Sequence, residues 1–349
     1  MVLKKVIDLE GNEILARPLM TWDYQIILPE GAVLKKEYID RIIELGILEV
    51  YVKKEVSAKE IVILKSEIEN SAKEKVKDIL ERHTYQNNQE LAQLSNTADN
   101  IISNILEEEQ IIEKIFDIKE RSTDIYEHSI SICSLAILTA LRMGMDKSKI
   151  HDIGVSCLLH DIGLRYSTTD FTNKDLINLN PQELAEYKKH PVNGFSSLKN
   201  EEWISDLSKN IILQHHETMD GKGFPLRMRD VSLECKIVTV CDTFDEMICG
   251  IGQKRVKVYE AIEYLKNYKN VKFDGKIVDT FLSFTAVYPA GSRVLTNEGE
   301  LAEVISQNKE FQDRPVIRIL KDKNGNDVKD EKILNLVKVH NVFIDKVVD

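Results

Sequence analysis

Apolar residues recur every three to four positions over most of the chain, the spacing of amphipathic helices. From 121 to 283 this period is interrupted only by loop-like stretches at 165–182 and 219–230. The charged stretch 58–82 and the stretch 90–120 follow the same period, and a polar segment at 83–89 separates them. The pattern predicts a mainly α protein with two long helices before its centre.

The two ends of the chain depart from this pattern. Residues 1–53 contain the β-like runs VIDL, QIIL and LEVYV, and an amphipathic stretch, KEYIDRIIELG, that Gly46 ends as a helix C-cap would. After Pro289 the sequence alternates and turns like the strands of a small β unit. We therefore expect an α+β module at 1–56, a helical connector at 57–118, a helical core at 119–285 and a β-rich unit at 286–349.

Composition narrows the class of protein. The chain carries 58 acidic and 47 basic residues, a net charge of −11, which disfavours binding to a nucleic-acid polymer. No apolar run approaches the roughly 18 residues of a membrane span, and the N-terminus lacks the apolar stretch of a signal peptide. The five cysteines form no CxxC pair and fit reduced thiols. We expect a cytoplasmic protein without membrane contact.

The tetrapeptide HDIG occurs twice, at 151–154 and 160–163. Nine residues at about 100° each place the two copies on opposite sides of one helix. Residues at helical spacing before His160 are mainly apolar, whereas those before His151 are polar. We take His160 and Asp161 as the site pair and expect His151 and Asp152 on the surface.

Other histidines and carboxylates flank this pair. Asp124 and His128 stand four residues apart, so both can face one metal ion from one helix. His190 precedes Pro191, which indicates a helix start or a tight turn. In KIVTVCDTFDEM, Asp242 ends an apolar run, and Asp245 follows about one helical turn later.

The segment LQHHETMDGKGFP at 213–225 carries two adjacent histidines from an apolar helix end into a glycine-rich loop. Adjacent helical side chains diverge by about 100°. His215 and His216 could therefore serve two different ions, or one ion and its substrate.

Imidazoles mixed with carboxylates argue against structural zinc and suit iron, manganese or another borderline-hard ion, with Asp161 a natural bridge between two ions. Two bridged ions about 3.5–4 Å apart activate water and neutralise an in-line phosphoryl transition state. The residues thus predict chemistry on anionic substrates such as phosphate esters.

At these motifs, residues 120–285 resemble the HD-GYP family of bacterial signalling phosphodiesterases, a branch of the HD phosphohydrolase superfamily. The resemblance implies an all-helical core that hydrolyses cyclic di-GMP to pGpG or GMP, with His160 and Asp161 as catalytic residues. It implies two iron or manganese ions, or three if Asp124 replaces the glutamate that some members use for a third ion. The implied metal ligands are His128, His160, Asp161, His190, His215, His216 and Asp242. Residues 1–53 resemble the small module that often precedes this core.

The chain departs from the family pattern in three places. Phe224 keeps the ring of the family's GYP tyrosine without its hydroxyl. Leu164 stands where a lysine usually follows HDIG, and Ile251 takes a usual arginine position, so that only Lys254 remains as a matching base. The expected substrate contacts are Gly223, Phe224, Pro225, Asp245 and Lys254.

Three functions remain open from the sequence. The first is an enzyme, a phosphodiesterase in which a metal-activated hydroxide attacks a cyclic dinucleotide, most directly cyclic di-GMP. The second, favoured by Leu164 and Ile251, is a signalling module that keeps its metals and binds without turnover. The third is a hydrolase of another phosphorylated metabolite. The flanking units leave a homodimer or a signalling partner protein open.

Overall fold

The computed structural model describes residues 2–9, 13–20, 26–52, 61–82, 89–107, 114–120, 123–169, 171, 176–309 and 311–348. The chain divides into two compact units, Met1–Ala58 and Lys59–Asp349. The polar loop expected at 83–89 lies outside the described residues, except for Gln89.

The first unit is a small α+β module. Strand β1 (Val2–Lys5) pairs antiparallel with β4 (Glu49–Val52), and β2 (Leu19–Met20) pairs with β3 (Ile26–Leu28). Helix α1 (Lys36–Glu44) buries Ile39 and Ile42 in the unit's apolar core. The helix and the strands expected at QIIL and LEVYV are confirmed. The strand expected at VIDL is wrong: Val6–Asp8 form a 3-10 turn, η1, because the chain turns there to bury Val6 while Ile7 stays exposed.

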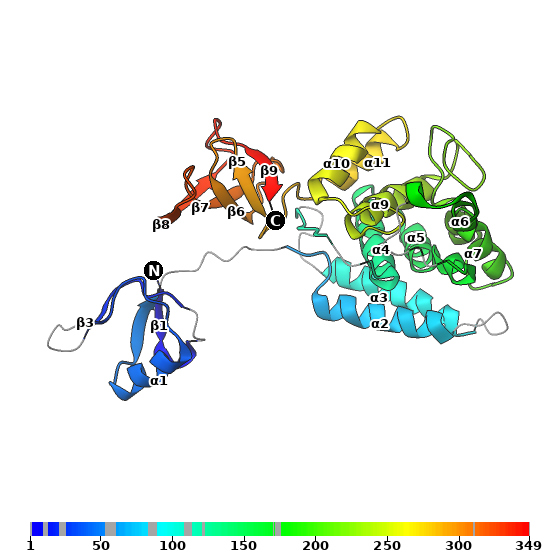
Figure 1. Ribbon diagram of the computed structural model, residues 1–349. Helices are drawn as coiled ribbons and strands as arrows, with labels where there is room; N and C mark the ends of the chain where they lie inside the picture. Colours follow the sequence, from blue (N-terminus) through cyan, green and yellow to red (C-terminus); the bar gives the residue numbers. More distant parts are fainter. Residues whose placement is uncertain are drawn as a thin grey trace. The chain divides into compact units, whose positions relative to one another are not determined.

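Helices of the second unit pack around α4 (Ile125–Arg142), which is buried at every position from 128 to 140. Figure 1 shows α2 (Ser66–Arg82) and α3 (Gln93–Glu107) side by side, and both contact α4, as do α5 (Lys147–Leu159) and α9 (Leu233–Cys249). The described part of this unit also contains the 3-10 turns η2 (Gln89–Ala92), η4 (Ile162–Tyr166) and η5 (Leu176–Asn178). Its further α-helices are α6 (Pro181–Tyr187), α7 (His190–Leu198), α8 (Asp206–Gln214), α10 (Val258–Asn267) and α11 (Gly275–Leu282).

Two helix ends differ from the expected ones. Helix α2 begins at Ser66 rather than near Ala58, and the N–H of Ile61 donates to Asp117 Oδ2 at 2.8 Å. The second expected helix ends at Glu107, and 114–120 contains no helix. Phe116 instead forms a bridge with Thr285, and Asp117 Oδ1 accepts from the N–H of Ala290 at 2.7 Å. Helical periodicity missed this because the segment's partners lie far along the chain.

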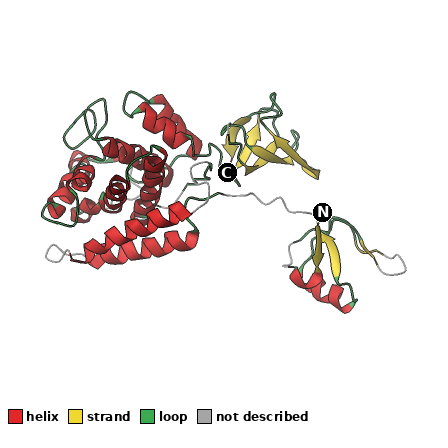
Figure 2. Ribbon diagram, turned by 180° about the vertical axis from the view of Figure 1, so that it is seen from behind, coloured by secondary structure: helices red, strands yellow, loops and turns green. Residues whose placement is uncertain are grey.

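The C-terminal part is a five-stranded antiparallel sheet, seen in yellow near the C-terminus in Figure 2. Alternate residues on its strands, such as Val294, Ala302 and Ile317, form its apolar core. Its strand order is β8 (Asp327–Asn335), β7 (Val316–Lys321), β6 (Leu301–Ser306), β5 (Arg293–Thr296) and β9 (Ile344–Val348). The mainly α fold with an α+β module before it and a β unit after it is confirmed. The division at 56, 118 and 285 stays a prediction.

None of the helices that the structure describes combines the length and the apolar character that a membrane crossing requires. All five cysteines are buried and free, as the absence of CxxC pairs indicated.

Candidate metal centre

The side chains that the family resemblance implies as metal ligands meet in one buried cluster. Their ligand atoms form two groups, and within each group all ligand atoms lie within 4.8 Å of one another. One group contains Asp161, His190, His215 and His216, and the other contains His128, His160 and Asp242. Asp161 lies between the groups, because its Oδ2 is 3.2 Å from His160 Nε2 and its Oδ1 is 3.2 Å from His190 Nε2. Helices α4, α5, α7, α8 and α9 all contribute to the cluster or end at it.

Three of the histidines are oriented by the helix ends that carry them. The Nδ1 atoms of His160, His190 and His215 each lie 2.8 Å from the carbonyl oxygen three residues earlier. A carbonyl only accepts, so Nδ1 carries the proton and Nε2 keeps its lone pair. Such carbonyls are available because the last turn of a helix has no intrahelical donor for them. The Nε2 atoms of His190 and His215 consequently face each other at 3.1 Å.

His128 is oriented by a carboxylate instead. Its Nδ1 lies 2.8 Å from Asp245 Oδ2, and Ser131 donates to Asp245 Oδ1 at 2.5 Å. Burial opposes a charge on this imidazole, but Asp242 and Asp245 outweigh it and raise the pKa of His128 well above its usual value. Asp245 is fully buried and contacts His128 from behind, and its expected role as a substrate contact stays a prediction.

The cluster holds polar atoms that the protein does not satisfy. Nε2 of His128, His160 and His216 and both carboxylate oxygens of Asp242 are buried without a well-formed hydrogen bond, although His128 Nε2 and Asp242 Oδ1 lie 3.1 Å apart as an ion pair. Buried atoms of this kind are costly unless an ion or water satisfies them. Imidazole and carboxylate donors suit iron, manganese and similar divalent ions. The residues present therefore fit a metal centre.

Burial and repulsion between imidazoles lower the pKa of two of the histidines, whereas burial of His160 is outweighed by the neighbouring Asp161, which raises its pKa. Burial, His160 and His190 together lower the pKa of His215 to about 3, and burial and His215 lower the pKa of His216 well below its usual value. Burial opposes a charge on Asp161 too, but His160 and His190 outweigh it and hold its pKa well below the ordinary range. A neutral imidazole and an ionised carboxylate are the forms that bind cations.

Two glycines let the backbone approach the cluster closely. A Cβ atom at Gly163 would overlap the carbonyl oxygen of His190 and lie 2.7 Å from the Gly194 nitrogen. Only glycine therefore lets η4 lie against the first turn of α7, where Asp161 meets His190. A Cβ atom at Gly223 would overlap the backbone that follows His216 in the same way.

The loop after α8 is held by one buried carboxylate. Glu217 accepts hydrogen bonds from three successive backbone N–H groups, 226–228, at 2.6 to 3.0 Å. The loop stacks Phe224 on His216 with ring centroids 4.4 Å apart, and Lys188 Nζ lies 5.9 Å from the Phe224 centroid. Pro225 follows directly in this loop, at the edge of the cluster.

Two other residues of interest lie apart from the ligand groups. Asp124 is the N-cap of α4, where it accepts from the N–H groups of Tyr126 and Glu127, and its Oδ2 is 3.2 Å from Lys73 Nζ. Among the described residues it belongs to none of the ligand groups. Lys254 is exposed between α9 and α10.

Sequence reasoning missed two residues in the wall of the cluster. Glu246 lies one turn after Asp242 on α9, and its carboxylate is within 4.8 Å of the ligand atoms of Asp242 and His216. The buried Tyr187 donates its hydroxyl to Glu246 Oε1 at 2.9 Å. Burial and the neighbouring Asp242 raise the pKa of Glu246 well above its usual value. The spacing of four residues from Asp242 is a signal in the sequence, whereas nothing there connects Tyr187 to this carboxylate.

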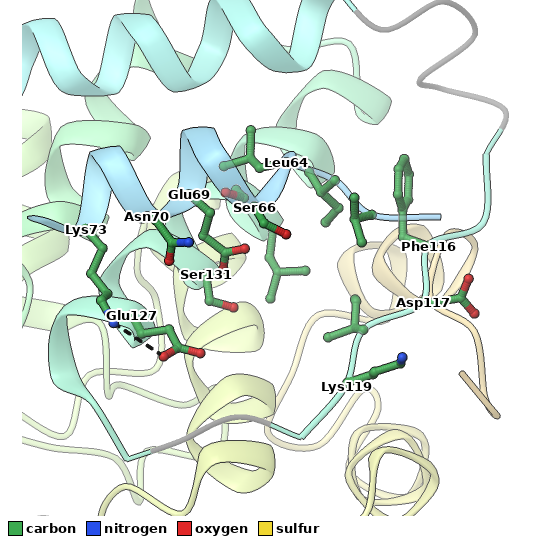
Figure 3. A pocket seen from close by; sticks show the side chains of 15 residues that line it. Leu64, Ser66, Glu69, Asn70, Lys73, Phe116, Asp117, Lys119, Glu127 and Ser131 are labelled. Atoms are coloured by element: carbon green, nitrogen blue, oxygen red, sulfur yellow. Dashed lines mark ion pairs between the residues drawn. The ribbon is translucent and has the colours of Figure 1, made fainter. Parts of the chain in front are cut away.

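A cavity of about 340 Å³ lies between the start of α2, the segment 114–119 and α4, and Figure 3 shows its lining. Glu127 and Ser131 of α4 line it, and Lys73 of α2 pairs with Glu127 at 3.8 Å. Ser131 also donates to Asp245, and Asp245 in turn contacts His128. A chain of hydrogen bonds therefore connects the lining of this cavity to a residue of the cluster.

Two family models match parts of the second unit. Residues 76–277 match the sequence model of the HD domain, and residues 293–349 match that of the KOW domain associated with the HD domain. Among solved structures, an HDG"Y"P protein from Bdellovibrio bacteriovorus aligns with a TM-score of 0.53 at 20% identity, covering 80% of this chain and 97% of that one. At this identity the likeness concerns the fold.

Curated proteins of similar sequence include three named as cyclic di-GMP phosphodiesterases. The one from Pseudomonas aeruginosa is 28% identical over 220 residues, which cover 62% of this chain and 53% of that protein. The one from Thermotoga maritima is 30% identical over 166 residues, which cover 46% of this chain and 45% of that protein. PdeB of Borreliella burgdorferi is 25% identical over 205 residues, which cover 57% of this chain and 52% of that protein. The chain spans about half the length of these relatives.

Proposed function

This chain belongs to the HD-domain family, and from that premise we propose that it is a metal-dependent phosphodiesterase that hydrolyses cyclic di-GMP to pGpG or GMP. The observation that carries the proposal is the buried cluster of imidazoles and carboxylates, several of whose polar atoms have no partner in the protein. The names of the similar curated proteins support the choice of substrate.

The two ligand groups suggest how the ions are divided. We assign one ion to Asp161, His190, His215 and His216, and a second to His128, His160 and Asp242. Asp161 is assigned to both, because each of its oxygens faces a histidine of a different group. Two such ions, iron or manganese, lower the pKa of a bound water and stabilise the charge that develops on the phosphoryl oxygens. Asp124 keeps its capping role in this assignment, which therefore uses two ions and not three.

The chain's own residues prepare the site. The helix-end carbonyls hold the imidazoles of His160, His190 and His215 with Nε2 directed at the cluster. These side chains are almost fully buried, so they make little contact with bulk water. With the ions bound, we assign neutral imidazoles whose Nε2 atoms are available as ligands, and Asp161 as a carboxylate.

Two cationic side chains near the cluster could contact substrate phosphates. They would replace the lysine and arginine of the family pattern, where this chain has Leu164 and Ile251. Arg165 lines a small cavity of about 20 Å³ that Asp161 also lines. Lys188 stands over Phe224 at the edge of the site. We propose Arg165 and Lys188 as contacts to the phosphates, since charge-assisted hydrogen bonds to anions are the strong ones. Gly223, Phe224, Pro225 and Lys254 remain proposed substrate contacts.

The second candidate function is a module that holds metals and binds the dinucleotide without hydrolysing it. This candidate is favoured by the burial of Ile251, which is 2% exposed. Ile251 carries no charge at a position where the HD-GYP family usually has an arginine.

The test is metal analysis of anaerobically purified protein, followed by chromatography of cyclic di-GMP incubated with the same sample. About two iron or manganese ions per chain together with pGpG or GMP would support the phosphodiesterase. Metal without product over hours would favour the binding module, and protein without metal would overturn both. Arg165→Ala should raise KM more than it lowers kcat, whereas Lys147→Ala, at an exposed position on α5, should change neither.

We also propose a cytoplasmic location, which the five free, buried thiols support. The net charge of −11 favours a small anionic substrate held by a local basic site over a nucleic-acid polymer. The flanking α+β and β units are proposed to serve a homodimer or a signalling partner protein.

A further inference from the structure

We propose that Glu246 is a further ligand of the metal centre, acting on the side of the cluster formed by Asp242 and His216. This inference rests on the proposed function, because it assumes that the cluster holds ions. Asp242 and Glu246 are four residues apart on α9, so both carboxylates project from the same face of that helix.

Distance and missing partners support this role. The ligand atoms of His216, Asp242 and Glu246 lie within 4.8 Å of one another, so Glu246 is within reach of the ion assigned to His216 and of the ion assigned to Asp242. Asp242 is 1% exposed, and neither of its oxygens has a hydrogen-bond partner; His216 Nε2 has none either. The carboxylate of Glu246 therefore lies beside ligand atoms of His216 and Asp242 that are buried without a hydrogen-bond partner.

Tyr187 is arranged to position this carboxylate. Its hydroxyl donates to Glu246 Oε1 at 2.9 Å, while its backbone carbonyl accepts from His190 Nδ1 at 2.8 Å. A Cβ atom at Gly252 would lie 3.0 Å from the Tyr187 hydroxyl, so the glycine gives the ring its space. A carboxylate has two oxygens and several lone pairs, so accepting from Tyr187 leaves it able to bind an ion. Tyr187 is thus a positioning residue for two ligands at once.

The charges of the cluster favour the same conclusion. Two divalent ions against Asp161, Asp242 and the neighbouring Asp245 would leave an excess of one positive charge in a buried site, and burying net charge is expensive. A carboxylate from Glu246 reduces that excess. Without a cation, an ionised carboxylate next to Asp242 adds repulsion, so an occupied cluster stabilises an ionised Glu246 more than an empty one does.

The experiment compares Glu246→Gln, Tyr187→Phe and the control Glu263→Gln, an identical change at an exposed position on α10. Metal-free protein is titrated with manganese, bound ions are counted by mass spectrometry, and Tm is measured with and without the ion. Glu246→Gln keeps an oxygen that can accept from Tyr187 but loses the anionic donor.

We expect Glu246→Gln to raise the Kd of the more weakly bound manganese ion by more than about 100-fold. Tyr187→Phe should raise it by about tenfold, in the range of outer-shell changes. Glu263→Gln should bind as the wild type does. Metal-free Glu246→Gln should melt at or above the wild-type Tm, and it should gain less from manganese.

Two results would overturn the inference. One is wild-type manganese affinity in Glu246→Gln, which would leave the proposed function intact. The other is a loss of Tm in the metal-free variant with no loss of affinity, which would make Glu246 a structural partner of Tyr187. If the wild-type protein itself binds no manganese or iron, the metal centre and the proposed function fail together with the inference.

Discussion

The two copies of HDIG take different roles, one inside a helix and the other at its end. In the first, at 151–154, His151 lies inside α5 with 30% of its side chain exposed, and its Nε2 is 3.0 Å from Ser95 Oγ. In the second, at 160–163, His160 is the C-cap of α5, and 1% of its side chain is exposed. The expectation that the second copy turns inward is confirmed by this burial, but the second copy lies at and beyond the end of α5 and not within one helix with the first.

The difference shows that the position of the tetrapeptide at the end of a helix matters as much as its sequence for orienting the histidine. Carbonyls around His151 accept the hydrogen bonds of the helix, so its ring turns to Ser95 and to Asp99, 3.7 Å away, on α3. At the end of α5 the carbonyl of Cys157 accepts from His160 instead. The chain then leaves the helix, which lets Asp161 point into the same cluster.

The largest expected contrast is between the two aspartates. Asp161→Ala should abolish measurable turnover of cyclic di-GMP and lower the bound metal, because both ligand groups lose an oxygen donor. Asp152→Ala, at a partly exposed position, should leave both within about twofold, as surface changes away from a site do. Chromatography and metal analysis of the two variants measure this. Equal effects, or full activity in Asp161→Ala, would end the assignment of the second copy.

The two glycines give the next contrast, in stability. Gly163→Ala should lower the free energy of unfolding by about 3 kcal/mol, because its Cβ would overlap the His190 carbonyl. At Gly154 a Cβ would meet the Ala98 Cβ at 3.3 Å, and the gain in helix propensity of about 1 kcal/mol offsets that tight contact. Gly154→Ala should therefore stay within about 1 kcal/mol of the wild type in urea unfolding. A tolerated Gly163→Ala would show that η4 can move away from α7.

A third variant tests whether support behind a histidine matters. The carbonyl behind His160 cannot be removed by substitution, but Asp245 behind His128 can. Asp245→Asn should weaken manganese binding by about ten- to hundredfold, the usual effect of losing such a group. Ser131→Ala should weaken it less, and Ser129→Ala is the matched control because its hydroxyl donates only to the Ile125 carbonyl in the described contacts. Unchanged affinity in Asp245→Asn would mean that helix packing alone holds His128.

The smallest effect is expected at His151. His151→Gln loses the contact with Ser95 and should cost at most about 1 kcal/mol of unfolding free energy. Metal content and turnover should not change. A loss of bound metal in this variant would reverse the comparison between the two copies.

Several features of the site were predictable because their causes are local. The apolar residues before His160 fixed which copy of HDIG turns inward, and Pro191 marked the helix start at which His190 stands. The expected divergence of His215 and His216 is different in the structure. Their ring centroids lie 4.2 Å apart at the end of α8, and both imidazoles belong to one ligand group.

The sequence by itself determined the mainly α fold, the β unit at the end and the residue types of the cluster, because periodicity, turn residues and motif spacing act over a few positions. Tertiary structure alone decided which long-range partners meet. It put Asp245 behind His128 from a position 117 residues away, joined Tyr187 to Glu246 across 59 residues, and drew Phe116 out of an expected helix to pair with Thr285. Such contacts depend on how separate helices pack, and no local pattern of residues encodes that packing.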